Sequence, residues 1–145
     1  MVFVEPVRFK DELDALRDAL AAADLPVDDI DQAGRQFLLL RDGAERLGFI
    51  GVEGEGPDRL LRSAIILPDK RGAGVGSQLV KELETFVRSD GCERLHLLTT
   101  TAEAFFARLG YRAKDRSTAP QVIAASREFA ELCPGSAIYM MKTFK

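Results

Sequence analysis

Hydrophobic and polar residues divide the first part of the chain into a strand, a long helix and a short helical piece. Residues 2–9 are rich in β-forming side chains that partly alternate with polar ones, which predicts a strand. Residues 10–24 carry leucines at helical spacing and acidic side chains in the first turn, a pattern typical of an amphipathic helix. Pro26 ends this helix, and we expect residues 27–33 to form a second, shorter one.

The next part of the chain predicts three consecutive strands. Residues 36–41 are mostly apolar and lead into Asp42-Gly43, a dipeptide that favours a β-hairpin. Residues 46–53 form the returning strand, and residues 59–67 form the next one after a polar loop that contains glycine. Strands joined in this way predict an antiparallel meander.

A helix and a further strand follow the meander. Residues 74–89 have apolar side chains at helical spacing, and the Asp-Gly pair after them is a C-terminal capping signal. Residues 95–100 predict a strand that is reached through this helical crossover. We therefore expect that strand to run parallel to residues 59–67.

The last part of the chain predicts two more helices and two more strands. Residues 100–103 match the capping-box pattern, which opens a helix that stops at Gly110. Residues 111–114 form a short strand, residues 118–132 a helix, and residues 137–143 a closing strand. The whole chain, residues 1–145, is thus predicted to be one α/β domain with a mixed, mostly antiparallel sheet of about seven strands.

Composition excludes several classes of protein. Lys and Arg number 20 against 23 Asp and Glu, and the net charge of −3 argues against a nucleic-acid partner. Cys92 and Cys133 lie far apart without metal-binding spacing, and there is one histidine, so we expect free thiols and no metal. The N-terminus lacks signal-peptide features, and no apolar run approaches the ~18 residues that cross a membrane. These features predict a cytoplasmic protein.

The stretch Arg71-Gly72-Ala73-Gly74-Val75-Gly76 lies between a predicted strand and a predicted helix. Glycines there let backbone N–H groups approach a ligand at the positive end of the helix, which suits a phosphate. The loop ends in Gly-Ser-Gln rather than Gly-Lys-Ser/Thr, so it is not a P-loop. Its position in mid-chain and its glycine spacing also differ from the dinucleotide fingerprint. A tight turn without a ligand remains an alternative.

Two motifs resemble the GNAT (GCN5-related) N-acetyltransferase superfamily. Arg71, Gly74 and Gly76 stand at the positions of its Arg/Gln-x-x-Gly-x-Gly/Ala motif, and Ile66-x-Pro68 resembles the Val-x-Pro end of the preceding strand. Residues 99–111 resemble the Asn-x-x-Ala-x-x-Phe-Tyr-x-x-x-Gly-Phe block of the same superfamily. The resemblance covers nearly the whole chain. It implies the GNAT fold, an α/β (α+β) architecture in which the fourth and fifth strands pair in parallel.

The resemblance also implies acetyl-CoA as the co-substrate and no metal. The positions that it places around acetyl-CoA belong to the fourth strand, the glycine loop, the following helix and the second motif. They are Ile65, Ile66, Leu67, Arg71, Gly72, Ala73, Gly74, Val75, Gly76, Ser77, Thr99, Phe105 and Phe106.

A narrower resemblance concerns GNAT proteins linked to arsenic-resistance operons. It is carried by residues 51–53, 60–63, 97–102 and 129–137. Members of that broad group are similar to phosphinothricin-type acetyltransferases, which acetylate the α-amino group of glutamate analogues.

The catalytic positions depart from the superfamily pattern. Phe106 stands where many members have a tyrosine that acts as general acid. Many members also have a glutamate on the fourth strand that acts as base, but residues 60–67 of this chain contain no carboxylate. For the base we select Glu53, whose alternative role is a solvated hairpin carboxylate. For the acid we consider Tyr111, although the apolar aromatic usual at that family position favours a packing role for it, and Tyr139 as an alternative. The thiolate could also leave without assistance.

Arginines suggest how an acceptor is bound. Arg62 interrupts an apolar strand beside Ser63, and it either grips an acceptor carboxylate or lies on a solvent-exposed face. Arg112 and Arg116 either add to this anion site or are the charges common on an edge strand. His96 alternates with leucines on a covered strand, which favours a hydrogen-bonded structural histidine over a base.

The sequence therefore predicts an acetyl-CoA-dependent N-acetyltransferase that acts on a small, amino-acid-like amine. An aminoglycoside, a polyamine or a protein terminus is an alternative acceptor. A catalytically silent acyl-CoA-binding module is a second alternative, because the usual acid and base are missing. The last strand and helix could pack on a second copy, which leaves a homodimer open.

Overall fold

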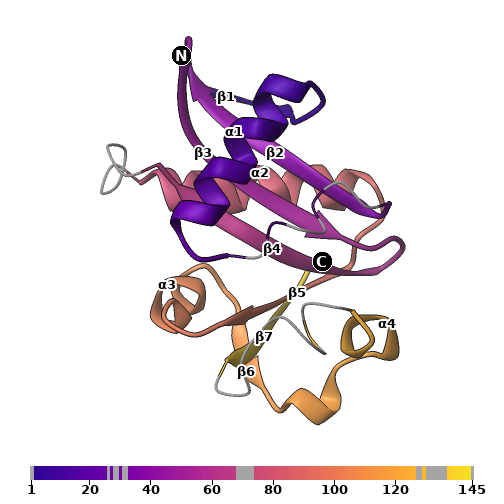
Figure 1. Cartoon of the computed structure of the whole chain (residues 1–145). Coiled ribbons are helices and arrows are strands. Elements are labelled where there is room, and N and C mark those ends of the chain that lie inside the picture. Colours follow the sequence, from indigo (N-terminus) through magenta and orange to yellow (C-terminus); the bar gives the residue numbers. More distant parts are fainter. Residues whose placement is uncertain are drawn as a thin grey trace. The chain divides into compact units, whose positions relative to one another are not determined.

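The structure is a computed structural model, and it describes the following residues: 2–25, 27, 30, 33–67, 74–126, 129 and 137–144. The strands in this part of the chain are β1 (Val2–Pro6), β2 (Arg35–Asp42), β3 (Glu45–Glu53), β4 (Asp58–Ile66), β5 (Arg94–Thr99), β6 (Arg112–Lys114) and β7 (Ile138–Thr143). The helices are α1 (Lys10–Ala22), α2 (Val75–Ser89), α3 (Glu103–Arg108) and α4 (Gln121–Ala124) (Figure 1).

The strands form one mixed seven-stranded sheet in the order β1-β2-β3-β4-β5-β7-β6. β4 and β5 pair in parallel, whereas β1 with β2, β2 with β3, and β7 with both β5 and β6 pair antiparallel. This arrangement confirms the predicted sheet and the predicted parallel pair. The contacts within the chain group it into two compact units, residues 1–53 with 62–86 and residues 54–61 with 87–145.

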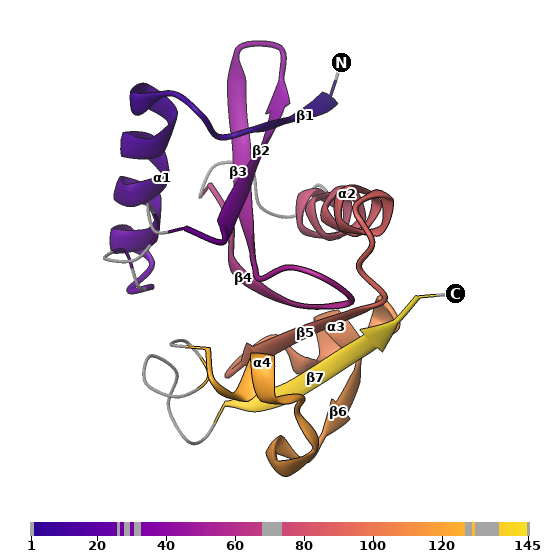
Figure 2. The ribbon, with the colours of Figure 1, turned by 90° about the vertical axis from the view of Figure 1, so that its right-hand side faces the viewer.

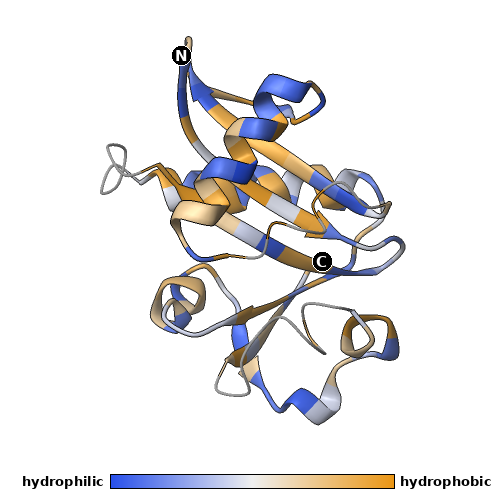
Figure 3. Ribbon diagram, viewed as in Figure 1, coloured by the Kyte–Doolittle hydropathy of each residue, from blue (hydrophilic) through white to orange (hydrophobic). Residues whose placement is uncertain are grey.

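The first unit is built on β1, β2, β3 and the second half of β4. α1 and α2 lie on opposite faces of these strands (Figure 2). Leu16 and Leu20 of α1 are fully buried against Phe37, Leu39 and Phe49 of the sheet. α1 carries both hydrophilic and hydrophobic residues (Figure 3), and its buried leucines form the apolar face of an amphipathic helix.

The β2–β3 hairpin turns one residue later than the sequence predicts. Asp42 pairs with Glu45, so the turn residues are Gly43 and Ala44. Gly43 has a φ of +61° and Ala44 has no positive φ, which fits a type II′ turn with glycine at its first central position. The pairing is regular from Arg35 to Leu40, with Leu38 opposite Ile50, and the register then shifts between Leu40 and Arg41, just before the turn.

The second unit is built on the first half of β4 together with β5, β7 and β6, and α3 and α4 lie on opposite faces of these strands (Figure 2). The end of α2 closes in a Schellman motif, as predicted for the Asp-Gly pair. The Cys92 N–H donates to Val87 O at 2.9 Å, the Gly91 N–H donates to Arg88 O at 3.3 Å, and Gly91 has a φ of +96°.

The predicted capping box of α3 is wrong. The helix begins at Glu103 with Ala102 as its N-cap, which has no side-chain capping bond. Thr99 supplies the local hydrogen bond instead, because its Oγ1 accepts from the Ala102 N–H at 3.0 Å. Thr100, the expected cap, stands two positions before the N-cap residue Ala102.

Other expectations are confirmed in part or lie outside the described residues. The predicted helix over residues 118–132 begins at Gln121, and its described part ends at Ala124. The short helix expected over residues 27–33 lies mostly outside the described part of the chain, and Cys133 lies wholly outside it. No helix that the structure describes is long and apolar enough to cross a membrane.

Candidate functional site

The glycine loop joins β4 to α2 within the first unit. Residues 71–73 lie outside the described part of the chain, whereas Gly74 to Ser77 lie within it. Gly74 has a φ of +76°, a left-handed conformation that glycine adopts without strain, and the space beside it is open. Its carbonyl accepts from the Gln78 N–H at 3.1 Å, which starts the helical hydrogen-bond pattern.

The N-terminus of α2 follows directly. The N–H groups of the first helical turn have no carbonyl partners within the helix, and the dipole makes this end positive. α2 spans Val75–Ser89 and has no acidic side chain in its first turn, so no carboxylate of that turn competes for these donors. The start of α2 therefore presents N–H groups at the positive end of a helix, which is a place where an anion can bind.

β4 approaches the loop as a distorted strand. Ser63 has a φ of +58°, a left-handed conformation that costs a non-glycine residue about 1–3 kcal/mol. A residue in this conformation bends a strand, as in a β-bulge. The backbone of β4 also lies very close to β3, because a Cβ at Gly48 would meet Ile65 O at 2.5 Å and Leu79 Cδ1 at 2.8 Å.

Arg62 is the largest fully buried side chain of the first unit and is 1% exposed. Its Nε donates to Ser63 Oγ at 3.1 Å, and its Nη1 lies 3.4 Å from Glu53 Oε1. The guanidinium carbon lies 5.9 Å from the ring centroid of Phe37. The alternative of an arginine on a solvent-exposed face is therefore wrong.

Glu53 lies between two guanidinium groups. Its Oε1 is 3.4 Å from Arg62 Nη1 and 3.6 Å from Arg35 Nε, and its side chain is 12% exposed. The sequence analysis selected Glu53 and Arg62 for separate roles and did not predict that they form an ion pair. It missed Arg35, whose pairing opposite Glu53 follows from the register of β2 and β3.

The second motif of the sequence forms an aromatic cluster in the second unit. The Phe106 ring lies edge-on to those of Phe105 and Tyr111, with centroids 5.0 and 5.5 Å away. Tyr111 is 2% exposed, and Lys142 Nζ lies 5.6 Å from its ring centroid. These surroundings support the packing interpretation of Tyr111. Arg112 is exposed on β6, an edge strand of the sheet, as an edge charge would be.

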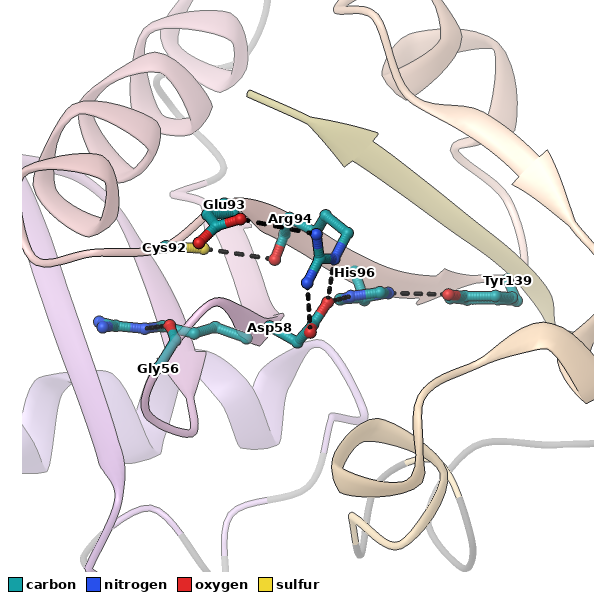
Figure 4. Close-up of polar contacts among 8 residues, drawn as sticks. Gly56, Asp58, Cys92, Glu93, Arg94, His96 and Tyr139 are labelled. Atoms are coloured by element: carbon teal, nitrogen blue, oxygen red, sulfur yellow. Dashed lines mark hydrogen bonds and ion pairs between the residues drawn. The ribbon is translucent and has the colours of Figure 1, made fainter. Parts of the chain in front are cut away.

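A buried polar chain crosses the second unit (Figure 4). His96 is 0% exposed, and its Nε2 lies 2.8 Å from Asp58 Oδ1 while its Nδ1 lies 2.7 Å from Tyr139 OH. Arg94 binds the same carboxylate with Nε to Oδ1 at 2.7 Å and Nη2 to Oδ2 at 2.9 Å. The expected hydrogen-bonded histidine is confirmed, but sequence reasoning missed Asp58.

The charges of this chain follow from its surroundings. Hydrogen bonds from Arg94 lower the pKa of Asp58, so the carboxylate is ionised at neutral pH. Burial lowers the pKa of His96, although the Asp58 carboxylate opposes the shift, and burial raises the pKa of Tyr139. Asp58 could have been found from the ladder, because Asp58 pairs with Arg94 and Leu60 with His96, which puts all four side chains on one face.

The comparisons with known proteins agree with this fold. A model of the acetyltransferase (GNAT) domain matches residues 33–113, more than half of the chain. A segment covering 37% of the chain is 40% identical to mouse N-alpha-acetyltransferase 80, but it spans 17% of that protein.

Solved structures are similar over almost the whole chain. N-acetylglutamate synthase from Neisseria gonorrhoeae, complexed with coenzyme A and L-arginine, matches 99% of the chain with a TM-score of 0.79 and 14% identity. The chain spans 33% of that synthase. An aminoglycoside 6'-N-acetyltransferase complexed with coenzyme A matches 99% of the chain and 96% of its own, with a TM-score of 0.73 and 18% identity. The family match and the shared fold lead to one conclusion: the chain belongs to the GNAT acetyltransferase family.

Proposed function

We propose that this protein transfers an acetyl group from acetyl-CoA to the amine of a small, amino-acid-like acceptor. The family match and the coenzyme A complexes of two similar structures support the donor. Within this chain, the proposal is supported mainly by the backbone conformation at the start of α2. There, Gly74 is open and left-handed, and helical N–H groups are free of helical partners.

The donor fits residues of the first unit. The N–H groups of Val75, Gly76 and Ser77 would bind the pyrophosphate, and each charge-assisted hydrogen bond contributes roughly 1.5–3 kcal/mol. The β4 residues Ile65, Ile66 and Leu67 would line the pantetheine arm. Three further loop positions, Arg71, Gly72 and Ala73, are proposed from the family motif alone. Thr99, Phe105 and Phe106 of the second unit are also proposed from the family motif.

The acceptor is proposed to carry a carboxylate. Arg62 is held at its Nε by Ser63 and lies over Phe37, so its planar fork has a fixed orientation. A planar guanidinium is the group that we propose to bind the carboxylate or phosphinate of the acceptor. Arg112 remains a second, weaker candidate for an anion contact, and its exposure on β6 supports only a peripheral role.

The reaction requires an uncharged amine, because an ammonium has no lone pair for attack. We propose that Glu53 takes the first proton from the acceptor, which then attacks the thioester carbon. A positioned base contributes about 10²–10⁴-fold to such a step. Tyr111, the other catalytic candidate, packs against Phe106 and is retained only as an alternative acid.

The most specific version of this proposal takes its acceptors from the arsenic-linked subgroup. These acceptors are glutamate-like phosphinic and arsinic compounds. They present the anion that Arg62 would bind. The free thiol of Cys92 supports a reducing compartment such as the cytoplasm. The sequence also leaves a homodimer open, with the last strand and helix packed on a second copy.

The test is release of free coenzyme A thiol from acetyl-CoA with a panel of amines. The panel comprises neutral amino acids, glutamate, phosphinic and arsinic analogues, a polyamine and an aminoglycoside. We expect turnover with the anionic amino acids and analogues. Turnover confined to the polyamine or aminoglycoside would overturn the acceptor class, and binding of acetyl-CoA without any turnover would favour a silent module.

A further inference from the structure

Two arginines of the first unit converge on one oxygen of Glu53. Arg62 Nη1 lies 3.4 Å from Glu53 Oε1, and Arg35 Nε lies 3.6 Å from the same atom. Among the described residues, none forms a hydrogen bond with the other carboxylate oxygen, Oε2. The two oxygens of this carboxylate therefore have different surroundings.

The position of Arg35 follows from the register of the sheet. Arg35 of β2 stands directly opposite Glu53 of β3, and residues opposite each other in an antiparallel pair share a face. The same guanidinium is anchored to the backbone, because its Nη1 donates to Ala33 O at 3.0 Å. Arg35 is therefore held in place beside the carboxylate by a second contact.

Arg62 reaches this face through the distortion of β4. Ile65 packs in the core cluster that contains Phe37, and Arg62 lies over the Phe37 ring. Residues three positions apart lie on opposite faces of a regular strand. Ser63 stands between them with a φ of +58°, and this left-handed residue explains why both side chains lie on the face of Phe37. Its Oγ also accepts from Arg62 Nε at 3.1 Å, which fixes the second guanidinium.

Both contacts to Glu53 are longer than those of a tight ion pair. Charge-assisted N–H···O bonds are usually about 2.7–2.9 Å long, and an arginine that faces a single carboxylate commonly binds both of its oxygens. Here each guanidinium is held by another group, and the carboxylate lies between the two. Arg35 thus attracts Oε1 to its own side and opposes a two-point pair between Glu53 and Arg62.

We propose that Arg35 is a positioning residue for acetyl transfer, which holds Oε1 of Glu53 so that Oε2 is left to take the proton of the acceptor ammonium. This inference rests on the proposed function, in which Glu53 is the base, and adds the residue that orients this base. Glu53 is the more accessible member of its pair with Arg62, since its side chain is 12% exposed and that of Arg62 is 0% exposed.

The proton transfer balances at Oε2. One N–H bond of the acceptor ammonium breaks, its electron pair stays on the nitrogen, and an O–H bond forms at Oε2. The neutral amine then has the lone pair that attacks the thioester carbon. Oε2 gives its proton to solvent, which restores the carboxylate between its two arginines.

The role of Arg35 differs from the role proposed for Arg62. An arginine that binds the anion of the acceptor acts mainly on the KM of that acceptor. A residue that orients the base acts on kcat, because the base works on the bound acceptor. Without Arg35, the Glu53 carboxylate can turn towards Arg62 and use both oxygens there, so that neither oxygen is left for the acceptor proton.

The experiment compares the steady-state kinetics of Arg35→Gln, Glu53→Gln and the double variant with those of the wild type. We expect Arg35→Gln to lower kcat about 10²-fold and to leave the affinity for acetyl-CoA unchanged. In the Glu53→Gln background, the same change should alter kcat by less than about twofold, since no base remains to be oriented. Arg35→Lys keeps the charge and should recover kcat to within about tenfold of the wild type.

Two kinetic results would overturn the proposal. An equal loss of kcat from Arg35→Gln in the wild-type and Glu53→Gln backgrounds would show that Arg35 does not act through Glu53. A higher KM of the acceptor with wild-type kcat would show that Arg35 contacts the acceptor rather than orienting the base.

Arg41→Gln is the matched control. Arg41 lies on the same strand as Arg35, and its guanidinium pairs with Glu5 and with Glu12, whose Oε2 lies 2.7 Å from Nη2. The two arginine side chains are similarly exposed, 18% for Arg41 and 14% for Arg35. Arg41→Gln removes the same charge and breaks two ion pairs, so it should lower the free energy of unfolding but keep kcat within about threefold. Equal losses of kcat in Arg41→Gln and Arg35→Gln would overturn the proposal.

Failure of this inference and failure of the proposed function give different results. If the wild type turns over and Arg35→Gln does so equally, Arg35 does not position the base and acetyl transfer stands. If the wild type binds acetyl-CoA and turns over no amine, the proposed function is wrong and the role of Arg35 falls with it. Thermal unfolding of each variant shows whether a loss of kcat reflects loss of the fold.

Discussion

Arg62 Nη1 lies 3.4 Å from Glu53 Oε1, and both side chains are almost completely withdrawn from solvent. Breaking a buried ion pair from one side costs about 3–5 kcal/mol, because the remaining charge loses its partner. The pair therefore has a structural role as well as a proposed chemical one. Variants must separate these two roles.

Glu53→Gln keeps the shape and hydrogen-bonding oxygen of the side chain but removes its basicity. We expect kcat to fall about 10²–10⁴-fold while acetyl-CoA binding is unchanged. Steady-state kinetics and calorimetry check both quantities. A kcat equal to that of the wild type would show that Glu53 pairs with Arg62 but does not act as a base.

Arg62→Lys keeps the charge but loses the planar fork. We expect the KM of an anionic acceptor to rise about tenfold or more, with a smaller effect on KM for acetyl-CoA. A neutral amine tested in parallel is the control, and its KM should change little. Equal changes for both acceptors would mean that Arg62 acts only through the fold.

The Asp58–His96 pair makes stability depend on pH. The folded-state pKa of His96 is below its ordinary value of 6.5, so the unfolded chain binds more protons below that pH. The contribution of His96 is fully present above pH 6.5 and is lost as pH falls toward the lowered folded-state pKa. Asp58, whose pKa is below 3.8, loses its contribution only at still lower pH.

We therefore expect the free energy of unfolding to decrease from pH 7 to pH 5 in the wild type. Chemical denaturation at a series of pH values measures it. His96→Gln should be less stable at pH 7 and should show a flatter dependence in this window. A wild-type profile that rises as pH falls would contradict the assignment of a buried, uncharged imidazole.

Gly48→Ala tests the close approach of β3 to β4. The added Cβ would meet the Ile65 carbonyl at 2.5 Å, and a backbone atom cannot yield as a flexible side chain can. We expect a loss of about 1–3 kcal/mol in the free energy of unfolding. Ala64→Ser, at an exposed position of β4, is the control and should stay within about 0.5 kcal/mol of the wild type.

The order of elements could be predicted because it depends on local signals. Helical spacing and the Asp-Gly pair located α2, and the crossover rule then required β5 to run parallel to β4. Errors arose where two local signals competed. Thr100 and Thr99 both offer a hydroxyl before α3, and only the backbone path selects Thr99 as the hydrogen-bond partner of Ala102.

The candidate site was predictable where a motif is contiguous and less so where it depends on pairing. The glycine loop is one stretch of sequence and leads directly to the start of α2. The line from Asp58 to Tyr139 joins residues 38 and 43 positions apart through His96, so no sequence window contains it. The burial of Arg62 was left open for the same reason, because it depends on Glu53 and Phe37 on other strands.

Calorimetric titration with acetyl-CoA measures whether this chain binds the proposed donor. Gly74→Val is the matched variant, because a β-branched residue is strained at a φ of +76°. We expect a single saturable site in the wild type and binding at least tenfold weaker in Gly74→Val. No saturable binding of acetyl-CoA by the wild type would contradict it.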